Sequence, residues 1–258
     1  MKKIIALILS VFVSVPSFAV GGAPPVQDKY EGGSGTALST AFVSNVTANN
    51  TLVVYIGQAS DSWALTAAPS NSCGDTFTEA SNSPVTGTGL RIRAYTTRTS
   101  GGCASITLNS TVSAPFGVWL GEYNNMADSG LVECVASGTG NSTALLTGNC
   151  VTTSAETTLV AFGHMPVDTV TFTEGSGYTI EHQAGGTGHS EVAEDKNVSS
   201  AGTYTGSATA GTSGQWGIHV MALKNATQPS AGGGSIITLP GTGSITTLPG
   251  TGSITTLR

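Results

Sequence analysis

The sequence predicts an all-β protein, a two-sheet antiparallel β-sandwich of jelly-roll or Greek-key type. Short apolar segments alternate with turn-forming residues about every 8–12 residues, which is typical of sandwiches and barrels. No segment repeats apolar residues at the i, i+3, i+4 and i+7 spacing of an amphipathic helix. The segment FGVWLGEY (116–123) is apolar on both alternating faces, so we expect a central strand that is covered on both sides.

The N-terminus has the three parts of a secretory signal peptide. Two lysines open the chain, a mostly apolar run follows over 4–15, and SFA (17–19) forms a small-x-small cleavage sequence. The apolar run has 12 residues, whereas a membrane-spanning helix needs about 20. We therefore expect export with cleavage after Ala19, to a secreted or extracellular location or the periplasm, and no membrane span.

The charge balance argues against nucleic acid as a partner. Removing residues 1–19 takes away two lysines, which changes the formal net charge from −6 to −8. Nucleic-acid binding needs clustered Lys and Arg. Only 9% of the residues are charged, and this composition suits an exported β-protein whose outer faces carry Thr, Ser and Asn.

Four cysteines in an exported chain indicate two disulfides. Three pairings are possible, and we predict the sequential one, Cys73–Cys103 and Cys134–Cys150. The alternative is a zinc site formed by the four thiolates, but no two cysteines have the close C-x2–4-C spacing that such sites use.

The chain divides into a flexible lead-in (20–35), a β-sandwich domain (36–224), a linker (225–234) and a repeat tail (235–258). Within 90–99, Leu90 and Ile92 are predicted to face inward, while Arg91, Arg93 and Tyr95 face outward. The expected strands are 36–44, 51–58, 63–67, 75–80, 90–99, 104–110, 116–123, 131–136, 144–153, 157–163, 169–173, 178–183, 190–195, 203–208 and 215–223.

The order of several segments resembles a group of exported bacterial jelly-roll or lectin-like β-sandwich domains, which occur in secreted and surface proteins of undefined function. The resemblance covers residues 36–224 and implies the fold alone, with no functional residues to carry over. The segments that carry it are TLVVYI, DTFTEA, GVWLGEY, TTLVAFG, TFTEGSGYTI, SSAGTYTGSAT and QWGIHVMALK.

The tail contains two nine-residue units and part of a third, which begin at Ser235, Ser244 and Ser253. Two full copies are too few for a self-supporting solenoid, so we expect a tail that is disordered or is ordered only with a partner, and self-association could use it. LPGTG at 239–243 and 248–252 matches the LPxTG pattern of sortase substrates, but only residues 253–258 follow, without the hydrophobic segment and basic end that this signal needs. We interpret the match as a property of the repeat.

The densest polar group offers a metal site. His189 and Glu191 lie two residues apart and would share a strand face, and Glu181 or His182 could complete a site for zinc or a similar divalent ion. Glu194 and Asp195 lie close by in the sequence. The alternative is that these side chains are solvated beside Gly-rich turns, so our expectation is no cofactor, with a divalent metal ion as the possible exception.

Two other groups are candidate ligand sites. Arg91, Arg93 and Tyr95 place an aromatic ring beside guanidinium donors, which suits a sugar or an anionic glycan; the alternative is a solvated outer face. Glu122 is a charged residue on a strand predicted to be buried, which is often functional.

Two further assignments concern oxygen ligands and tryptophans. A calcium site formed by Glu122, Asn124, Asn125 and Asp128 is the alternative to an ordinary turn. Three tryptophans lie in apolar segments and are predicted to be core residues rather than sugar platforms: Trp63, Trp119 and Trp216.

No G-x-S-x-G, H-E-x-x-H or phosphate-binding glycine loop is present. The sequence therefore favours a secreted, non-catalytic protein that binds a glycan or cell-surface polymer. The first alternative is a structural subunit of a surface layer or filament, in which the arm or tail adds a strand to a neighbouring sheet. The second is a glycan-cleaving enzyme on a jelly-roll scaffold, which needs two carboxylates within about 5–10 Å in one cleft.

Overall fold

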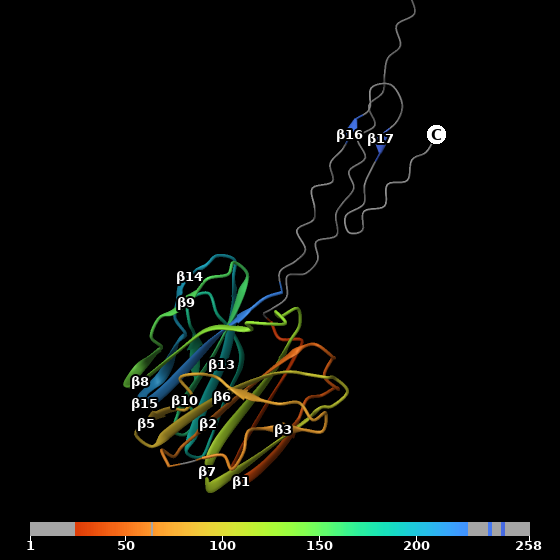
Figure 1. The fold of residues 1–258 in the computed structure, drawn as a ribbon. Helices are drawn as coiled ribbons and strands as arrows, with labels where there is room; N and C mark the ends of the chain where they lie inside the picture. The colour runs from red at the N-terminus through yellow and green to blue at the C-terminus, as the bar shows by residue number, and fades with distance from the viewer. Residues whose placement is uncertain (1–23, 63, 227–236, 239–243, 246–258) are drawn as a thin grey trace, which may run out of the picture.

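The structure, a computed structural model, describes residues 24–62, 64–226, 237–238 and 244–245. Every regular element in this part of the chain is a strand (Figure 1). Their bounds are β1 Gln27–Ala41, β2 Thr51–Gln58, β3 Ser70–Asn71, β4 Thr78–Glu79, β5 Val85–Gly87, β6 Leu90–Arg98, β7 Ser105–Tyr123, β8 Val132–Leu146, β9 Cys150–Thr152, β10 Thr157–Met165, β11 Phe172–Glu174, β12 Thr179–Gly186, β13 His189–Val198, β14 Gly202–Tyr204, β15 Ser207–Lys224, β16 Ile237–Thr238 and β17 Ser244–Ile245.

Two antiparallel sheets form the body, and each is built from one half of the chain (Figure 1). The first sheet has the order β1-β7-β2-β6-β4, with β3 beside β7 and β5 beside β6. The second has the order β11-β15-β10-β13-β12, with β8 also paired to β15. The predicted two-sheet antiparallel sandwich is confirmed.

The two sheets repeat one topology. Strands β1, β7, β2 and β6 are neighbours in the same order as β8, β15, β10 and β13. The β1–β7 ladder and the β8–β15 ladder share one irregularity in their pairing. In the first sheet, consecutive pairs are Gly35–Ala114 and then Ala37–Asn109. In the second sheet, they are Ser142–Gly214 and then Ala144–Thr209. In both ladders two positions on one strand span five on the other, so the halves are equivalent in register as well as in order.

Short sequence matches fall at equivalent places in the two halves. The turn between β5 and β6 reads GTGL (87–90), and the turn between β12 and β13 reads GTGH (186–189). Strand β2 begins TLV at Thr51, and TLV occurs again in β10 from Thr158. Tyr55 and Phe162 are equivalent in this alignment, and their rings stack on each other across the two sheets, with centroids 5.2 Å apart. We therefore describe the protein as two copies of one unit packed face to face.

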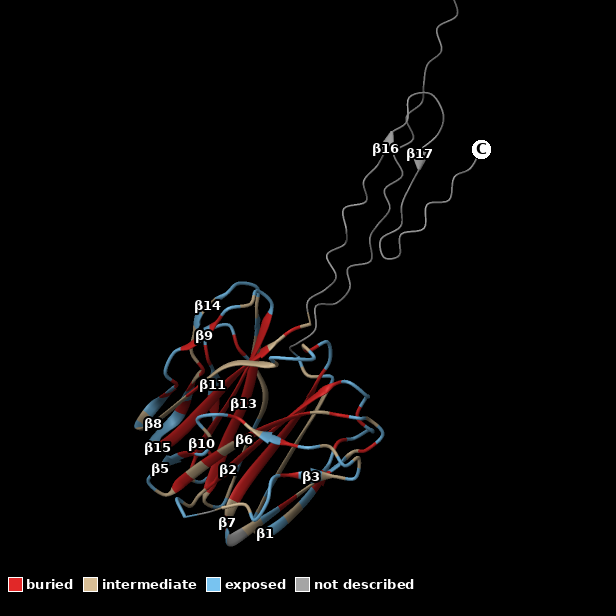
Figure 2. Ribbon diagram, in the orientation of Figure 1, coloured by how far each residue is buried: buried red, intermediate tan, exposed pale blue. Residues whose placement is uncertain are grey.

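The buried apolar side chains form three layers, and buried residues run along the central strands of both sheets (Figure 2). One lies between the sheets and includes Tyr55, Trp119 and Phe162. A second fills the curl of the first sheet, and a third lies on the outer side of the second sheet. Trp119 and Tyr123 of β7 enter the layer between the sheets, whereas the alternate side chains Phe116, Val118 and Leu120 enter the curl. The predicted coverage of both faces of 116–123 is confirmed.

Both predicted disulfides are present, Cys73–Cys103 and Cys134–Cys150. The first closes a loop of 30 residues in the first half, and the second a loop of 16 residues in the second half. Each disulfide therefore lies within one of the two units and does not join the sheets.

Some predicted boundaries were wrong. The lead-in expected over 20–35 is strand from Gln27 onward, and β1 continues through its glycines to Ala41. Gly32 has little room for a side chain there, because its Cβ would lie 2.8 Å from the Tyr30 hydroxyl oxygen. The strand expected at 75–80 is reduced to Thr78–Glu79. Most of the tail and residue 63 fall outside the described residues.

No helix in the described part of the chain could cross a membrane.

Candidate functional site

The inner face of β13 carries an unusual series of titratable side chains. His189, Glu191 and Asp195 occupy alternate positions, so all three point toward the first sheet. His164 of β10 lies directly opposite Glu191 in the ladder. All four are buried, with exposed fractions of 0–5%. Burial of ionisable groups is costly unless they are paired, so each of these side chains needs a hydrogen-bond or charge partner.

Glu191 is the centre of the first cluster. Its Oε1 atom lies 2.9 Å from His164 Nδ1, and its Oε2 atom accepts a hydrogen bond of 2.8 Å from the Tyr30 hydroxyl. His189 Nδ1 lies 3.1 Å from Oε1 and 3.0 Å from Oε2. Strands β1, β10 and β13 thus place one phenol and two imidazoles around a single carboxylate.

A row of glycines in the first sheet leaves space for this cluster. Gly32, Gly117 and Gly57 are direct ladder neighbours on β1, β7 and β2. A Cβ on Gly57 would lie 2.6 Å from His164 Nδ1, and a Cβ on Gly117 would overlap the Glu191 carboxylate. Side chains at these positions would clash with the cluster, so glycine is the residue that fits.

The first unit shows what the same positions hold when only packing is required. In the turn GTGL the place of His189 is taken by Leu90, and the ladder register gives Ile92 as the counterpart of Glu191 and Gly57 as that of His164. Leu90 and Ile92 are both fully buried. The polar cluster is therefore an addition of the second unit, and the fold of the unit does not require it.

The electrostatics stabilise the ionised carboxylate. Burial raises the pKa of Glu191, but the hydrogen bonds from His164 and His189 outweigh burial, and the net pKa lies below its ordinary value. The hydrogen bond to Glu191 raises the pKa of His189, against the opposing effect of burial. Burial and the nearby Glu191 charge raise the pKa of Tyr30. His164 Nε2 is buried without a hydrogen-bond partner.

A hollow of about 430 Å³ opens beside His189, between the terminal strands β1 and β12. A Cβ on Gly186 would lie 2.6 Å from His189 Nε2, and a Cβ on Gly32 would lie 3.0 Å from its Cε1 atom. Two glycines therefore cover this edge of the imidazole. The hollow is lined by Tyr30, Gly32, Gly33, Ser34, Gly185, Gly186, Thr187 and His189.

A second cluster lies further along β13. The Tyr123 hydroxyl donates a hydrogen bond of 2.8 Å to Asp195 Oδ2, and Asp195 also hydrogen-bonds to Glu181. Burial, with the neighbouring Glu181 charge, raises the pKa of Asp195 to about 8. Glu194 points to the opposite face, where burial raises its pKa to about 7. Asp195 and Glu181 border a separate hollow of about 250 Å³.

The four residues predicted as metal ligands do not converge. His189 and Glu191 are in contact, but the His182 ring stacks on Tyr30 with centroids 4.5 Å apart. Glu181 is the extra residue of a β-bulge and lies beside Asp195.

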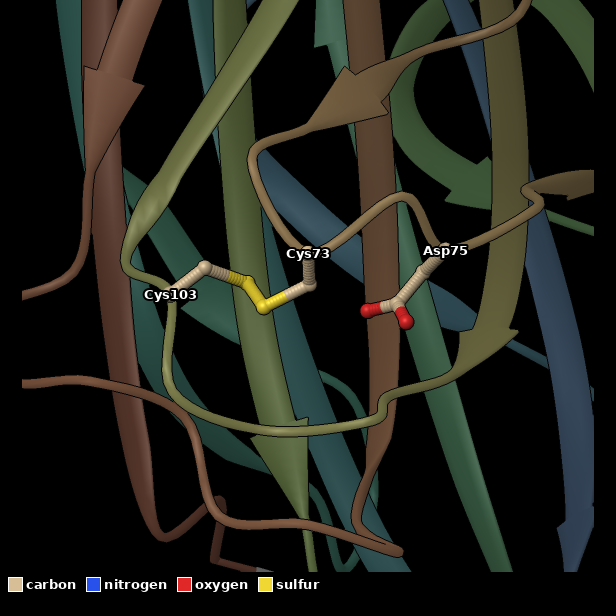
Figure 3. Close-up of side chains that lie close together, drawn as sticks. All are labelled: Cys73, Asp75 and Cys103. Atoms are coloured by element: carbon tan, nitrogen blue, oxygen red, sulfur yellow. A yellow bond between two sulfur atoms is a disulfide. The ribbon is translucent and has the colours of Figure 1, made fainter.

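Elsewhere in the described chain, one group of three potential ligand side chains lies within 4.8 Å: Cys73, Asp75 and Cys103. Figure 3 shows that the two sulfur atoms are bonded to each other beside the Asp75 carboxylate. Asp75 accepts hydrogen bonds from Asn71 and Ser100. This arrangement is a disulfide with a loop-closing aspartate, and disulfide sulfurs are not the thiolates that bind metals.

The predicted sugar-binding face on β6 is covered. Arg91, Arg93 and Tyr95 do share one face, but that face points into the curl of the first sheet, where Tyr95 is 2% exposed. Arg93 pairs with Glu79 at 3.0 Å. The buried Tyr95 ring has no face available for stacking on a sugar.

The surroundings of Glu122 indicate a structural role. It is fully buried and accepts hydrogen bonds from Gln27 Nε2, Asn50 Nδ2 and the Thr47 amide at 2.5–2.8 Å. The other residues of the predicted calcium site do not share its surroundings: Asp128 pairs with Arg98, and Asn124 and Asn125 are exposed. Glu122 therefore ties the start of β1 to the loop before β2.

Trp119 and Trp216 are buried, as predicted, and their indole N–H groups donate to Asp28 and Ser142. Trp63 lies outside the described residues. Tyr30 and His164 were not predicted from the sequence: Tyr30 lies in the expected lead-in, and His164 follows directly after the strand expected at 157–163. The repeated GTG turn was a usable signal, because it sets Leu90 beside His189 in an alignment of the two halves.

No family model, curated protein or solved structure matches the chain.

Proposed function

We propose that this chain is a secreted, non-catalytic protein that binds a glycan outside the cell, in the hollow between β1 and β12. The signal-like N-terminus and the two disulfides support an extracellular location. The observation that carries the proposal is that polar residues occupy the positions beside the hollow in the second unit, where the first unit has Leu90 and Ile92.

The composition of the hollow suits a hydroxyl-rich ligand. It combines the Tyr30 ring, the side-chain hydroxyls of Ser34 and Thr187, one imidazole edge and exposed glycine backbone. Sugar hydroxyls both donate and accept, so they can match such mixed groups, and a few convergent polar groups in a concave surface are what fix a ligand. The terminal position of β1 and β12 leaves the outer edge of each strand without a ladder partner among the described strands.

The hollow supports binding better than glycan cleavage. The described residues that line it include no carboxylate, and both oxygens of the nearby Glu191 are hydrogen-bonded. Glu181 and Asp195 are hydrogen-bonded to each other, whereas the two carboxyl groups of glycosidases stand about 5–10 Å apart.

The test uses the mature full chain, residues 20–258, on a broad glycan array. Gly186→Ala places a methyl group 2.6 Å from His189 Nε2 and so closes the imidazole edge. We expect wild type to give a saturable signal and Gly186→Ala to weaken it at least tenfold. Gly87→Ala is the matched control, because Gly87 is the counterpart of Gly186 and its Cβ would lie 3.2 Å from Leu90.

Gly87→Ala should bind as wild type does. A blank array with a cooperatively folded wild-type chain would refute the proposal. If Gly186→Ala binds as tightly as wild type, the glycan does not bind in this hollow.

A further inference from the structure

The tautomer of neutral His189 is fixed by Glu191. A carboxylate only accepts hydrogen bonds, so the Nδ1 atom that lies 3.0–3.1 Å from both of its oxygens carries the proton. The Nε2 atom of the neutral ring is then an acceptor with a free lone pair. His164 and Tyr30 hold the other sides of the carboxylate, so Glu191 cannot rotate away from this arrangement.

That acceptor atom is at the wall of the hollow. Nε2 is the atom nearest to the missing Cβ of Gly186, and Gly186 itself lines the hollow. His189 is 5% exposed, so a ligand reaches the edge of the ring and not its faces. A hydroxyl group is small enough to approach over a glycine and can donate the proton that Nε2 accepts.

The charges around the hollow disfavour an anion. Among the described lining residues there is no lysine or arginine. Glu191 lies directly behind His189, and Asp168 accepts a hydrogen bond from the amide of Gly188, which precedes His189. An acidic sugar would bring its charge toward two carboxylates without a free cation to compensate, so the site matches a neutral ligand.

We propose, on the basis of the glycan-binding function above, that the hollow selects neutral sugars by accepting a sugar hydroxyl on His189 Nε2, and that protonation of His189 weakens their binding. The protonated ring can only donate at Nε2, so the bound hydroxyl has to turn from donor to acceptor. Glu191 and His164 act as positioning residues in this scheme.

The direction of the pH effect follows from the groups that face His189. These are Glu191 on β13, Tyr30 on β1, His164 on β10, His182 stacked on Tyr30 from β12, and Asp168 in the preceding loop. The hydrogen bond to Glu191 raises the pKa of His189 above its ordinary value, so protonation of Nε2 begins above the pH expected for a free histidine. Glu191 stays ionised over this range because its pKa is lowered, whereas burial lowers the pKa of His182, in the opposite direction to that of His189.

The experiment is the glycan array repeated at pH 8.5 and pH 5.5. The probes are neutral hexose-terminated oligosaccharides and the same cores capped with a uronic acid. We expect neutral probes to bind at pH 8.5, binding to fall at least tenfold at pH 5.5, and uronic-acid caps to abolish it. His189→Gln keeps a polar side chain that does not titrate, and it should bind at least tenfold more weakly with no difference between the two pH values.

Gly87→Ala should keep the wild-type pH profile, and thermal melts of every protein at both pH values show whether the domain is folded. Binding that is equal at the two pH values, or that prefers the uronic-acid caps, would overturn this inference and leave the glycan-binding proposal standing. Binding of no probe at either pH would overturn both.

Discussion

Glu122 shows how one buried carboxylate can be mistaken for a ligand residue. Its position on a strand covered on both faces is unusual for an acid, but three donors from Gln27, Thr47 and Asn50 satisfy it completely. Glu191 is equally buried and also fully hydrogen-bonded, but one of its donors, His189, opens onto a hollow. None of the three donors of Glu122 lines that hollow.

Replacing Glu122 with alanine should lower the free energy of unfolding by about 3 kcal/mol, because it leaves several buried donors without an acceptor. Urea unfolding monitored by tryptophan fluorescence measures this change. Glu122→Gln, which retains an acceptor, should lose less, and glycan binding should be unaffected in both variants. A loss of under about 1 kcal/mol for Glu122→Ala would mean that water replaces the carboxylate.

At the scale of elements, β13 and its counterpart β6 solve the same packing problem in two ways. β6 fills the space between the sheets with Leu90 and Ile92, whereas β13 uses His189 and Glu191. Buried ion pairs are often no more stabilising than apolar residues of similar size, but breaking one by removing a single partner is costly. The stability of the polar cluster can therefore be compared with that of apolar residues at the same positions.

Glu191→Ala should reduce the free energy of unfolding by about 3–5 kcal/mol, because it leaves two imidazoles and a phenol without their acceptor. The combined variant His164→Leu, His189→Leu and Glu191→Ile, which brings in the apolar character of the first unit, should be at least as stable as wild type while losing glycan binding. Chemical denaturation and the array measure the two effects. A combined variant less stable than Glu191→Ala would show that the cluster holds the sheets together.

At the scale of the whole molecule, the second sheet carries buried acids whose pKa values are shifted in opposite directions. The pKa of Asp195 is raised to about 8 and that of Glu194 to about 7, both chiefly by burial, so each folded-state pKa exceeds its unfolded value. Their stabilising contribution is complete below the unfolded pKa and is lost as the pH rises through the folded one. Glu191, with a lowered pKa, contributes in the opposite sense and loses its stabilisation when the pH falls below its unfolded pKa of about 4.5.

Stability should therefore be greatest near pH 5 and should decline toward pH 8. Urea midpoints measured from pH 4 to pH 9 test this profile. Asp195→Asn should flatten the decline between pH 5 and pH 8, whereas Glu79→Gln, which alters an acid outside this layer, should not. A wild-type midpoint that rises between pH 5 and pH 8 would contradict the assignment.

The features that sequence reasoning predicted are those encoded by near neighbours. Alternation within 116–123 predicted which side chains share a face, and the predicted sequential pairing of the cysteines is confirmed. The site could not be predicted in the same way, because Tyr30 and Glu191 are 161 positions apart and meet only when the sheets pack. The glycines of β1 were interpreted as part of a flexible segment, because local composition does not show that Gly32 makes room for a cluster from the other sheet.

The ends of the two units meet at one corner of the molecule. The amide of Val26 donates to Glu122 and that of Ala226 to Asn125, so the chain enters and leaves within three positions of the same segment. The connection between the units, residues 128–130, is exposed at this corner. A circular permutant that starts at Gly130 and joins Ala226 to Pro24 through a short loop would keep every ladder of both sheets. The order in which the halves are translated is thus separable from the architecture they build.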